Sequence, residues 1–263
     1  MTEHLLFSVE ARIATIRLNR PEKRNAFTLE MIDAWTDALD ECRRNEDIHV
    51  VVVTGTGDKA FCAGGDIGRM DTPEGRAPFA RKQKLWDHIH RIPLLLEDLD
   101  KPVIVAVNGA AMGAGMDMAL MGDVRFAAES ARFGETYVKV GVVPGDGGAY
   151  YLPRLVGTAK ALELFWTGDL ISAAEAERLG IVNKVLPDAE LMPYTYAFAE
   201  RLVRGSTLAI RMTKRAVYQG ARQDLRSALD LISSHLAILG TTEDHAEAVR
   251  AFGERREPVF KGR

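Results

Sequence analysis

The stretch KPVIVAVNGAAMGAGMDMALMGD, Lys101 to Asp123, decides how the rest of the chain is interpreted. It begins with the β-branched apolar run Val103–Val107, passes through Asn108-Gly109 and several small residues, and enters an apolar segment that carries one acid, Asp117. An apolar β-branched run that ends in a glycine turn and is followed by an apolar segment predicts a strand, a tight turn and a helix start.

The turn and helix start in this stretch also form a candidate anion site. The small residues Ala110–Gly115 leave the backbone N–H groups open to close approach by a ligand. The first N–H groups of a helix have no partner within the helix, and the helix dipole adds partial positive charge there. Asp117 follows Ala114 by three residues, about one helical turn, so a carboxylate and a free N–H face the same small volume. Tight packing of a Gly/Ala-rich helix explains the same residues without any ligand.

Composition limits the class of protein. With 263 residues, of which 47% are hydrophobic, the chain can bury one large core together with a smaller helical part. A net charge of -3 with both signs dispersed argues against a nucleic-acid or membrane partner. The sequence shows no leader-like or membrane-spanning apolar run, so we expect a cytoplasmic protein. Two cysteines and six histidines without an H-x-x-x-H pair predict reduced thiols and no metal site.

The first part of the chain predicts a largely parallel α/β structure. Leu5–Glu10 and Ile13–Leu18 alternate apolar and polar residues as in a hairpin, and Thr28 precedes a helical pattern. After a buried-type strand at Val50–Val53, the stretch Lys59–Ile67 again combines small residues and glycines with a helix start. In a parallel sheet this turn and the turn before Asp117 lie at the same strand ends, so two peptide N–H groups can converge.

Farther along, periodicity predicts a helix at residues 81–99 bent at Pro93, a third glycine turn at 142–148, and a helix capped by Ser172. A short strand at Ile181–Leu186 follows. Beyond Pro187 helical periodicity dominates, which predicts a core at residues 1–190 and a helical module at 191–263. The helices expected in that last third span roughly 188–204, 207–219, 223–239 and 243–253.

Several ungapped motifs together identify a family. In chain order they are R-P-x-x-x-N-A at 20–26, F-C-A-G-G-D-I at 61–67, K-P-V-I-V-A-V-N-G-x-A-x-G-A-G at 101–115, F-G-x-x-x-x-x-x-G-x-x-P-G-x-G-G at 133–148, T-G-D-x-I-S-A-x-E-A at 167–176 and G-I-V-N at 180–183. The chain resembles the crotonase family, the enoyl-CoA hydratase/isomerase superfamily, over nearly its whole length.

The resemblance implies a spiral of ββα units followed by a C-terminal helical module that forms homotrimers or homohexamers. It also implies an acyl-CoA substrate and no separate cofactor, because coenzyme A is part of the substrate. The shared chemistry is stabilisation of a thioester enolate by two backbone N–H groups, which by motif belong to Gly65 and Ala114. The CoA moiety would follow Asn25, Ala26, Ala63, Asp66 and Ile67, with Lys23 and Arg24 at its phosphates, although solvated basic residues explain the last two equally well.

The chain departs from the hydratase pattern at the catalytic positions. Where the family's hydratases carry two glutamates, this sequence has Asp117 and Tyr137. A tyrosine is neutral at pH 7 and donates a proton more readily than it accepts one. Asp146 would replace the missing carboxylate if it faced the acyl pocket, but it can equally cap the next helix. For Glu135 we expect a surface position, with the cavity as the alternative.

The motifs favour an enzyme that hydrates or isomerises a 2,3-unsaturated acyl-CoA, with Asp117 as acid/base and Tyr137 as proton donor or as a residue that orients water or substrate. The Asp at the first position is shared with a family branch that shifts double bonds in dienoyl-CoA, but that branch uses further acids where this chain has Tyr137 and Gly145. Two alternatives stay open. One is hydrolytic carbon–carbon cleavage of a β-diketone or a cyclic β-keto thioester, and the other is an acyl-CoA-binding protein without turnover.

Overall fold

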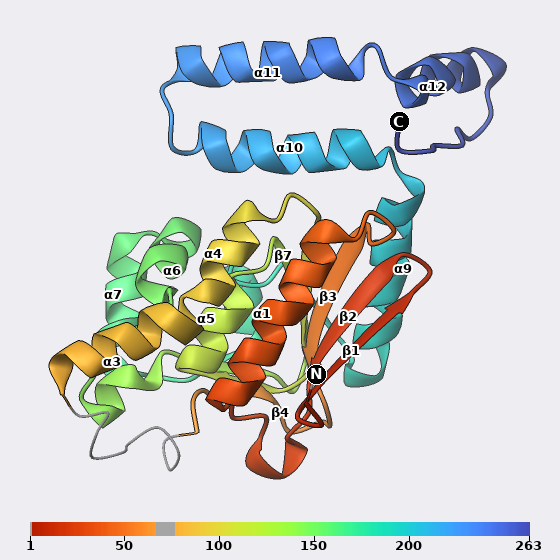
Figure 1. The fold of residues 1–263 in the computed structure, drawn as a ribbon. Coiled ribbons are helices and arrows are strands. Elements are labelled where there is room, and N and C mark those ends of the chain that lie inside the picture. The colour runs from red at the N-terminus through yellow and green to blue at the C-terminus, as the bar shows by residue number, and fades with distance from the viewer. Residues whose placement is uncertain (1, 67–76) are drawn as a thin grey trace.

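The computed structural model describes residues 2–66 and 77–263, which form two sheets wrapped by helices (Figure 1). The larger sheet has the order β1-β2-β3-β5-β7-β10; only β1 and β2 pair antiparallel. Its strands are β1 (Leu5–Glu10), β2 (Ile13–Leu18), β3 (Val50–Gly55), β5 (Val103–Val107), β7 (Val124–Ala128) and β10 (Lys184–Leu186). The smaller sheet, β4-β6-β8-β9, contains β4 (Ala60–Cys62), β6 (Ala110–Met112), β8 (Arg132–Gly134) and β9 (Ile171–Ser172).

Helices fill most of the remaining chain. The α-helices are α1 (Leu29–Arg44), α3 (Pro78–Lys84), α4 (Arg91–Asp98), α5 (Ala114–Leu120), α6 (Gly148–Val156), α7 (Thr158–Thr167), α8 (Ala173–Arg178), α9 (Leu191–Arg204), α10 (Thr207–Gly220), α11 (Leu225–Leu239) and α12 (Glu243–Glu254). Short 3-10 helices occupy η1 (Pro21–Lys23), η4 (Thr136–Val140) and η5 (Asp188–Glu190), and one π-helical turn, η3, spans Leu85–Ile89.

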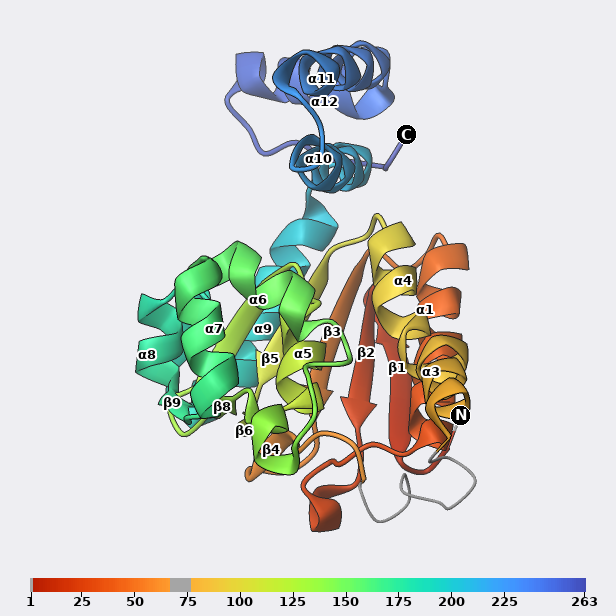
Figure 2. The same cartoon turned by 90° about the vertical axis from the view of Figure 1, so that its left-hand side faces the viewer.

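The large sheet is buried on both faces, as its continuous apolar strands require. Because side chains alternate across a strand, Val51 and Val53 of β3 join the core under α1, α4 and α5, while Val50 and Val52 face the opposite side. There α9 covers the sheet, with Phe126 of β7 in edge-to-face contact with two of its aromatic rings. Figure 2 shows α9 and α5 on opposite sides of the strands. The sheet thus fixes α5, which carries Asp117, in the centre of the molecule.

Local signals in the sequence identify most elements. The predicted hairpin is confirmed residue by residue, from Leu5 opposite Leu18 to Glu10 opposite Ile13. Thr28 caps α1 by accepting from the Met31 N–H. Ser172 caps α8 in the same way, by accepting a bond from an N–H three residues on. The caps hold because each side-chain oxygen satisfies an N–H that the helix cannot.

Two predictions about element boundaries are wrong. The helix expected at residues 81–99 is divided into α3, η3 and α4, and Pro93 lies in the first turn of α4, where its missing N–H costs no hydrogen bond. The strand expected at Ile181–Leu186 begins only at Lys184, because the N–H groups of Ile181 and Val182 both bond the Ala176 carbonyl and close the end of α8.

The last three helices project from the rest of the protein. Figures 1 and 2 both place α10, α11 and α12 beyond the end of the large sheet, whereas α9 lies against its face. No residue of α10 or α11 is buried. A helical module after residue 190 remains a prediction, and this packing favours α10 as the start of the projecting part. No helix within residues 2–66 and 77–263 is long and apolar enough to span a bilayer.

Candidate active site

The glycine turns that follow β4 and β6 lie side by side, as the sequence predicted. The two strands pair in parallel, Ala60 with Ala110 and Cys62 with Ala111. Their turns pack so closely that a Cβ built on Gly115 would lie 2.1 Å from the Cys62 carbonyl oxygen. The absence of a side chain at Gly115 is therefore what allows the start of α5 to meet the segment after β4.

Two backbone N–H groups at this junction have no acceptor among the described residues. Ala114 is the first residue of α5, so its N–H lies ahead of the helical hydrogen bonds. Gly65 forms an isolated parallel bridge with Phe27. The two hydrogen bonds of this bridge run from the Phe27 N–H to the Gly64 carbonyl and from the Asp66 N–H to the Phe27 carbonyl, so neither uses the Gly65 N–H. Their role as an oxyanion hole remains a prediction.

Next to this junction lies a buried acid cluster, formed by Asp117, Tyr137, Asp146 and Glu135. Asp117 is 0% exposed, and its Oδ2 accepts a hydrogen bond from the Tyr137 hydroxyl at 2.7 Å. The same hydroxyl oxygen lies 3.2 Å from Asp146 Oδ2, and the Asp146 N–H donates to Asp117 Oδ2 at 3.3 Å. One phenol therefore bridges two carboxyl groups that come from α5 and from the third glycine turn.

The backbone of α6 closes the cluster on its other side. A Cβ built on Gly148 would lie 2.0 Å from Asp117 Oδ1, so only glycine fits at the first position of α6. The double glycine at 147–148 was visible in the sequence, but nothing in it indicated that one glycine touches a carboxylate encoded 31 residues earlier. Gly148 thus belongs to the candidate site as a steric requirement.

Burial shifts the ionisation of the cluster toward the protonated forms. It raises the pKa of Asp117 to about 6; the hydrogen bond from Tyr137 and the nearby Gly148 N–H oppose that rise, while the charge of Asp146 adds to it. Burial also raises the pKa of Asp146 and that of Tyr137, so the phenol stays protonated and acts as a hydrogen-bond donor. Such perturbed acids are costly to bury, and their concentration here makes the cluster a candidate functional site.

Two expectations about the neighbouring acids are settled by the geometry. Asp146 does not cap α6, because Gly147 occupies the N-cap position without any side-chain bond and Asp146 turns to Tyr137 instead. The surface position expected for Glu135 is wrong, since this residue is only 1% exposed. The chain leaves β8 at Glu135 with φ -85° and ψ 70° before entering η4, and this irregular turn directs the side chain inward.

The residues predicted to line the CoA path fall into two groups. Asn25 is fully buried, and its side chain accepts from the Arg20 N–H and donates to the carbonyls of Thr56 and Ala60. It therefore holds the loop in shape. Ala26 and Ala63 are half-buried beside it, Lys23 and Arg24 are exposed, and Asp66 is half-buried, whereas Ile67 lies outside the described residues. A CoA-binding role for any of them remains a prediction.

Sequence reasoning missed Arg20, which opens the first family motif. Its guanidinium is buried and donates to the Ala26 carbonyl at 2.6 Å and to Asp66 Oδ2 at 3.1 Å. The ion pair fixes the residue immediately after Gly65. Arg20 consequently holds the residue next to the Gly65 peptide, which is proposed for anion binding. The Arg-Pro pair at the start of the first motif is the signal from which Arg20 could have been found.

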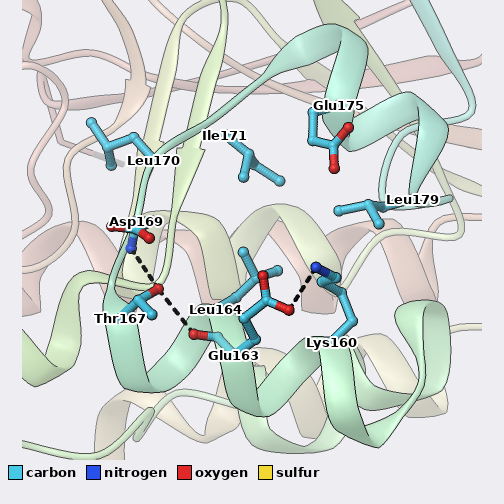
Figure 3. A pocket seen from close by; sticks show the side chains of 9 residues that line it. All are labelled: Lys160, Glu163, Leu164, Thr167, Asp169, Leu170, Ile171, Glu175 and Leu179. Carbon is cyan, nitrogen blue, oxygen red and sulfur yellow. Dashed lines mark hydrogen bonds and ion pairs between the residues drawn. The ribbon is translucent and has the colours of Figure 1, made fainter.

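A pocket of about 340 Å³ lies apart from the acid cluster, between α7, β9 and α8 (Figure 3). Its lining is largely polar, with Lys160 paired to Glu163 at 2.7 Å, and it includes no member of the cluster. Within the described residues, no group of three or more His, Cys, Asp or Glu side chains has an arrangement that could hold a metal ion. The acid cluster beside the two glycine turns is thus the stronger candidate for chemistry.

Comparison with known proteins gives one consistent result. The family model for enoyl-CoA hydratase/isomerase matches residues 8–263. The chain is 36% identical to a crotonyl-CoA hydratase of Syntrophomonas wolfei, covering 98% of each protein. It is also 36% identical to a 1,2-epoxyphenylacetyl-CoA isomerase of Escherichia coli, covering 100% of each.

Solved structures agree with the sequence matches. The fold is similar to that of an enoyl-CoA hydratase from Bacillus anthracis, with a TM-score of 0.93, 33% identity and coverage of 99% of this chain and 100% of the other. A second structure, from Mycobacterium abscessus, gives a TM-score of 0.94 at 32% identity over 98% of this chain and 100% of the other. From motifs, fold and full-length matches together, the chain belongs to the enoyl-CoA hydratase/isomerase family and has the crotonase fold.

Proposed function

We propose that the protein binds an unsaturated acyl-CoA thioester and catalyses hydration or double-bond isomerisation through an enolate. The observation that carries this proposal is the position of Asp117. Its buried carboxylate is hydrogen-bonded to Tyr137 and lies on the same short helix as the free N–H of Ala114. Relatives named as hydratases and as an isomerase share the whole length of the chain, which supports this class of chemistry.

In this proposal the thioester carbonyl oxygen accepts hydrogen bonds from the N–H groups of Gly65 and Ala114. Negative charge accumulates on that oxygen as the enolate forms, so fixed donors stabilise the transition state more than the substrate. Each such donor typically lowers the barrier by about 3 kcal/mol. The contacts of Gly115 and Gly64 with the opposite turn supply the rigidity that this preorganisation requires.

Asp117 transfers the proton at the α-carbon, C2. Its pKa of about 6 lies close to neutral pH, so the ionised and the protonated forms are both accessible during turnover. The Tyr137 hydroxyl donates to Oδ2 and fixes the orientation of the carboxylate. A tyrosine at this position is then compatible with catalysis, because it orients the acid/base group without itself accepting a proton.

Asp146 supplies the second carboxylate that water addition needs. Its Oδ2 lies 3.2 Å from the oxygen of the Tyr137 hydroxyl that also binds Asp117. In hydration, water attacks C3 while a carboxylate takes its proton, and C2 receives a proton from the other carboxyl group. Isomerisation needs only one carboxylate, which carries a proton from C4 to C2. Asp146 therefore favours hydration, and isomerisation is the second candidate.

Product labelling distinguishes these reactions. The protein is incubated with a panel of enoyl-, dienoyl- and β-keto-acyl-CoA thioesters in H₂¹⁸O and in D₂O, and the products are analysed by mass spectrometry. Oxygen-18 at C3 identifies hydration, whereas deuterium at C2 or C4 without new oxygen identifies isomerisation. Cleavage of a carbon–carbon bond would establish the hydrolase alternative. Tight thioester binding with no change in any substrate would contradict the proposal and indicate a binding protein.

We also propose that the projecting helices assemble the protein into a trimer or hexamer. Four apolar residues on α11, at spacings of four, three and four, form one exposed stripe: Leu225, Leu229, Ile232 and Leu236. Amphipathic helices gain most of their stability by burying such a face, so we expect this stripe to pack against another subunit. Light scattering at micromolar concentration measures the assembly directly, and a stable monomer would contradict the proposal.

The proposed reaction takes place in the cytoplasm. It needs no metal or redox cofactor, and coenzyme A takes part only as a portion of the substrate. Every proton transfer is assigned to a side chain, and the negative charge of the enolate is stabilised by backbone N–H groups. Activity should therefore survive dialysis against EDTA. A loss of activity that a divalent cation restores would show that the assignment of charge stabilisation is wrong.

A further inference from the structure

Glu135 is a buried acid for which the proposed reaction has no assigned role. It is 1% exposed, and neither of its carboxyl oxygens has a hydrogen-bond donor among the described residues. Asp117 Oδ1, also buried, is likewise without a hydrogen-bond partner, although the nearby Gly148 N–H favours the ionised form of Asp117. Three buried acceptor oxygens without donors would be a large cost if both groups were ionised.

The two carboxyl groups lie within hydrogen-bonding reach of each other, and a hydrogen bond between them favours the charged form of Asp117 and the neutral form of Glu135. Two carboxylates cannot form that bond, because an ionised carboxyl group has no proton to donate. Asp117 Oδ2 is already occupied by the Tyr137 hydroxyl and the Asp146 N–H, so Oδ1 is the oxygen left to accept. One proton on Glu135 supplies Asp117 Oδ1 with a donor and removes the charge from Glu135, whose remaining oxygen without a donor is then that of a neutral carbonyl.

We propose that Glu135 is a positioning residue, kept as a neutral carboxylic acid, whose O–H donates a hydrogen bond to Asp117 Oδ1 and keeps Asp117 as the ionised member of the pair. Both oxygens of Asp117 then accept from neutral donors, Oδ1 from Glu135 and Oδ2 from the Tyr137 hydroxyl and the Asp146 N–H. The catalytic consequence rests on the proposed function, since it concerns the group assigned to proton transfer. The protonation state of Glu135 does not depend on it.

Charges around Glu135 agree with this assignment. Its charged and polar neighbours are Asp117 on α5, Tyr137 on η4 and Asp146 in the third glycine turn. The His90 ring binds the carbonyl of Gly145, the residue before Asp146, at 2.8 Å. Burial and, after it, the negative charge of Asp117 together raise the pKa of Glu135 to about 10. Among the described residues, no basic side chain contacts Glu135 to favour its ionised form.

Two substitutions separate the neutral from the ionised form. Glu135→Gln keeps a neutral hydrogen-bond donor of similar shape, whereas Glu135→Leu keeps the volume and removes the donor. Infrared spectra at pH 7 should contain a protonated-carboxyl band that both variants lack. Difference spectra against Asp117→Asn then follow the titration of Asp117 without any substrate, and the acid limb of kcat/KM follows it during turnover.

We expect the midpoint of the Asp117 titration in Glu135→Gln to stay within about 0.3 pH unit of the wild-type midpoint. In Glu135→Leu the midpoint should rise by about 1 pH unit, the effect of losing one hydrogen bond to a charged group. An ionised Glu135 predicts the reverse: no protonated-carboxyl band lost at pH 7, and a lower midpoint in Glu135→Gln because a neighbouring negative charge disappears. Either result overturns the proposal, as does an unchanged midpoint in Glu135→Leu. Because the infrared readings need no turnover, an inactive protein would refute the proposed reaction while still testing Glu135.

Discussion

Replacing Gly115 by alanine tests whether the close contact of the two glycine turns is needed for activity. The new Cβ would lie 2.1 Å from the Cys62 carbonyl oxygen and 2.7 Å from its carbonyl carbon, both backbone atoms. Such contacts do not occur below 3.0 Å, so the start of α5 and the segment after β4 must separate by about 0.9 Å. A misplacement of about 1 Å in a catalytic group lowers the rate on the order of 10²-fold, and overpacking costs about 1–3 kcal/mol of stability.

The assay is kcat/KM with the best thioester of the panel, together with urea denaturation. Gly253→Ala in α12 is the matched control, because a Cβ there meets nothing within 4 Å and alanine is the better helix former. We expect Gly115→Ala to lose about 10²-fold in kcat/KM while Gly253→Ala stays at the wild-type value or gains slight stability. A folded Gly115→Ala protein with wild-type kcat/KM would refute the claim that this contact positions the Ala114 N–H.

Three further predictions follow from the acid cluster and the projecting helices. Tyr137→Phe should reduce kcat/KM by about 10-fold or more, because one hydrogen bond to a charged group is lost. The same variant should shift the acid limb of the kcat/KM profile to higher pH, and an unshifted limb would show that the phenol does not act on Asp117. Because burial raises the pKa of Asp117 from 3.8 to about 6, its contribution to stability is present below pH 4 and is lost as the pH rises through 6. Asp117→Asn should therefore add up to about 3 kcal/mol to the free energy of unfolding at pH 7 and about 1 kcal/mol at pH 4.5, and equal gains in urea denaturation at both pH values would contradict this. Replacing Leu229 and Leu236 by aspartate should dissociate the proposed oligomer in light scattering, and an unchanged mass would place the interface elsewhere.

Elements that depend on local chemistry were predictable from the sequence. Thr28 and Ser172 were identified as caps because a side-chain oxygen ahead of a helical pattern has one nearby use. The strand Val103–Val107 and the start of α5 at Ala114 followed from an apolar run, a glycine turn and an apolar segment. These signals also placed Asp117 one turn after a free N–H, which is most of the candidate site.

Features that depend on contacts between distant segments were not predictable. Glu135 is buried because the chain bends between β8 and η4, and no periodicity in the sequence encodes that bend. The break of the helix at residues 81–99 occurs at the π turn η3, not at Pro93, the residue that a local rule selects. Gly148 is required by a carboxylate on another helix. Tertiary packing decides each of these positions.

The most direct test of the central claim, that Asp117 transfers a proton at C2 of an enolate held by two backbone N–H groups, is the incorporation of solvent deuterium at C2 of the acyl-CoA. Wild-type protein in D₂O should label C2 with the accepted substrate, and Asp117→Asn should label it about 10²–10⁴-fold more slowly while binding the thioester within a few-fold of wild type. Asp146→Asn is the matched comparison. Wild-type labelling by Asp117→Asn, with labelling abolished in Asp146→Asn, would contradict the account and place the proton-transfer group on the third glycine turn.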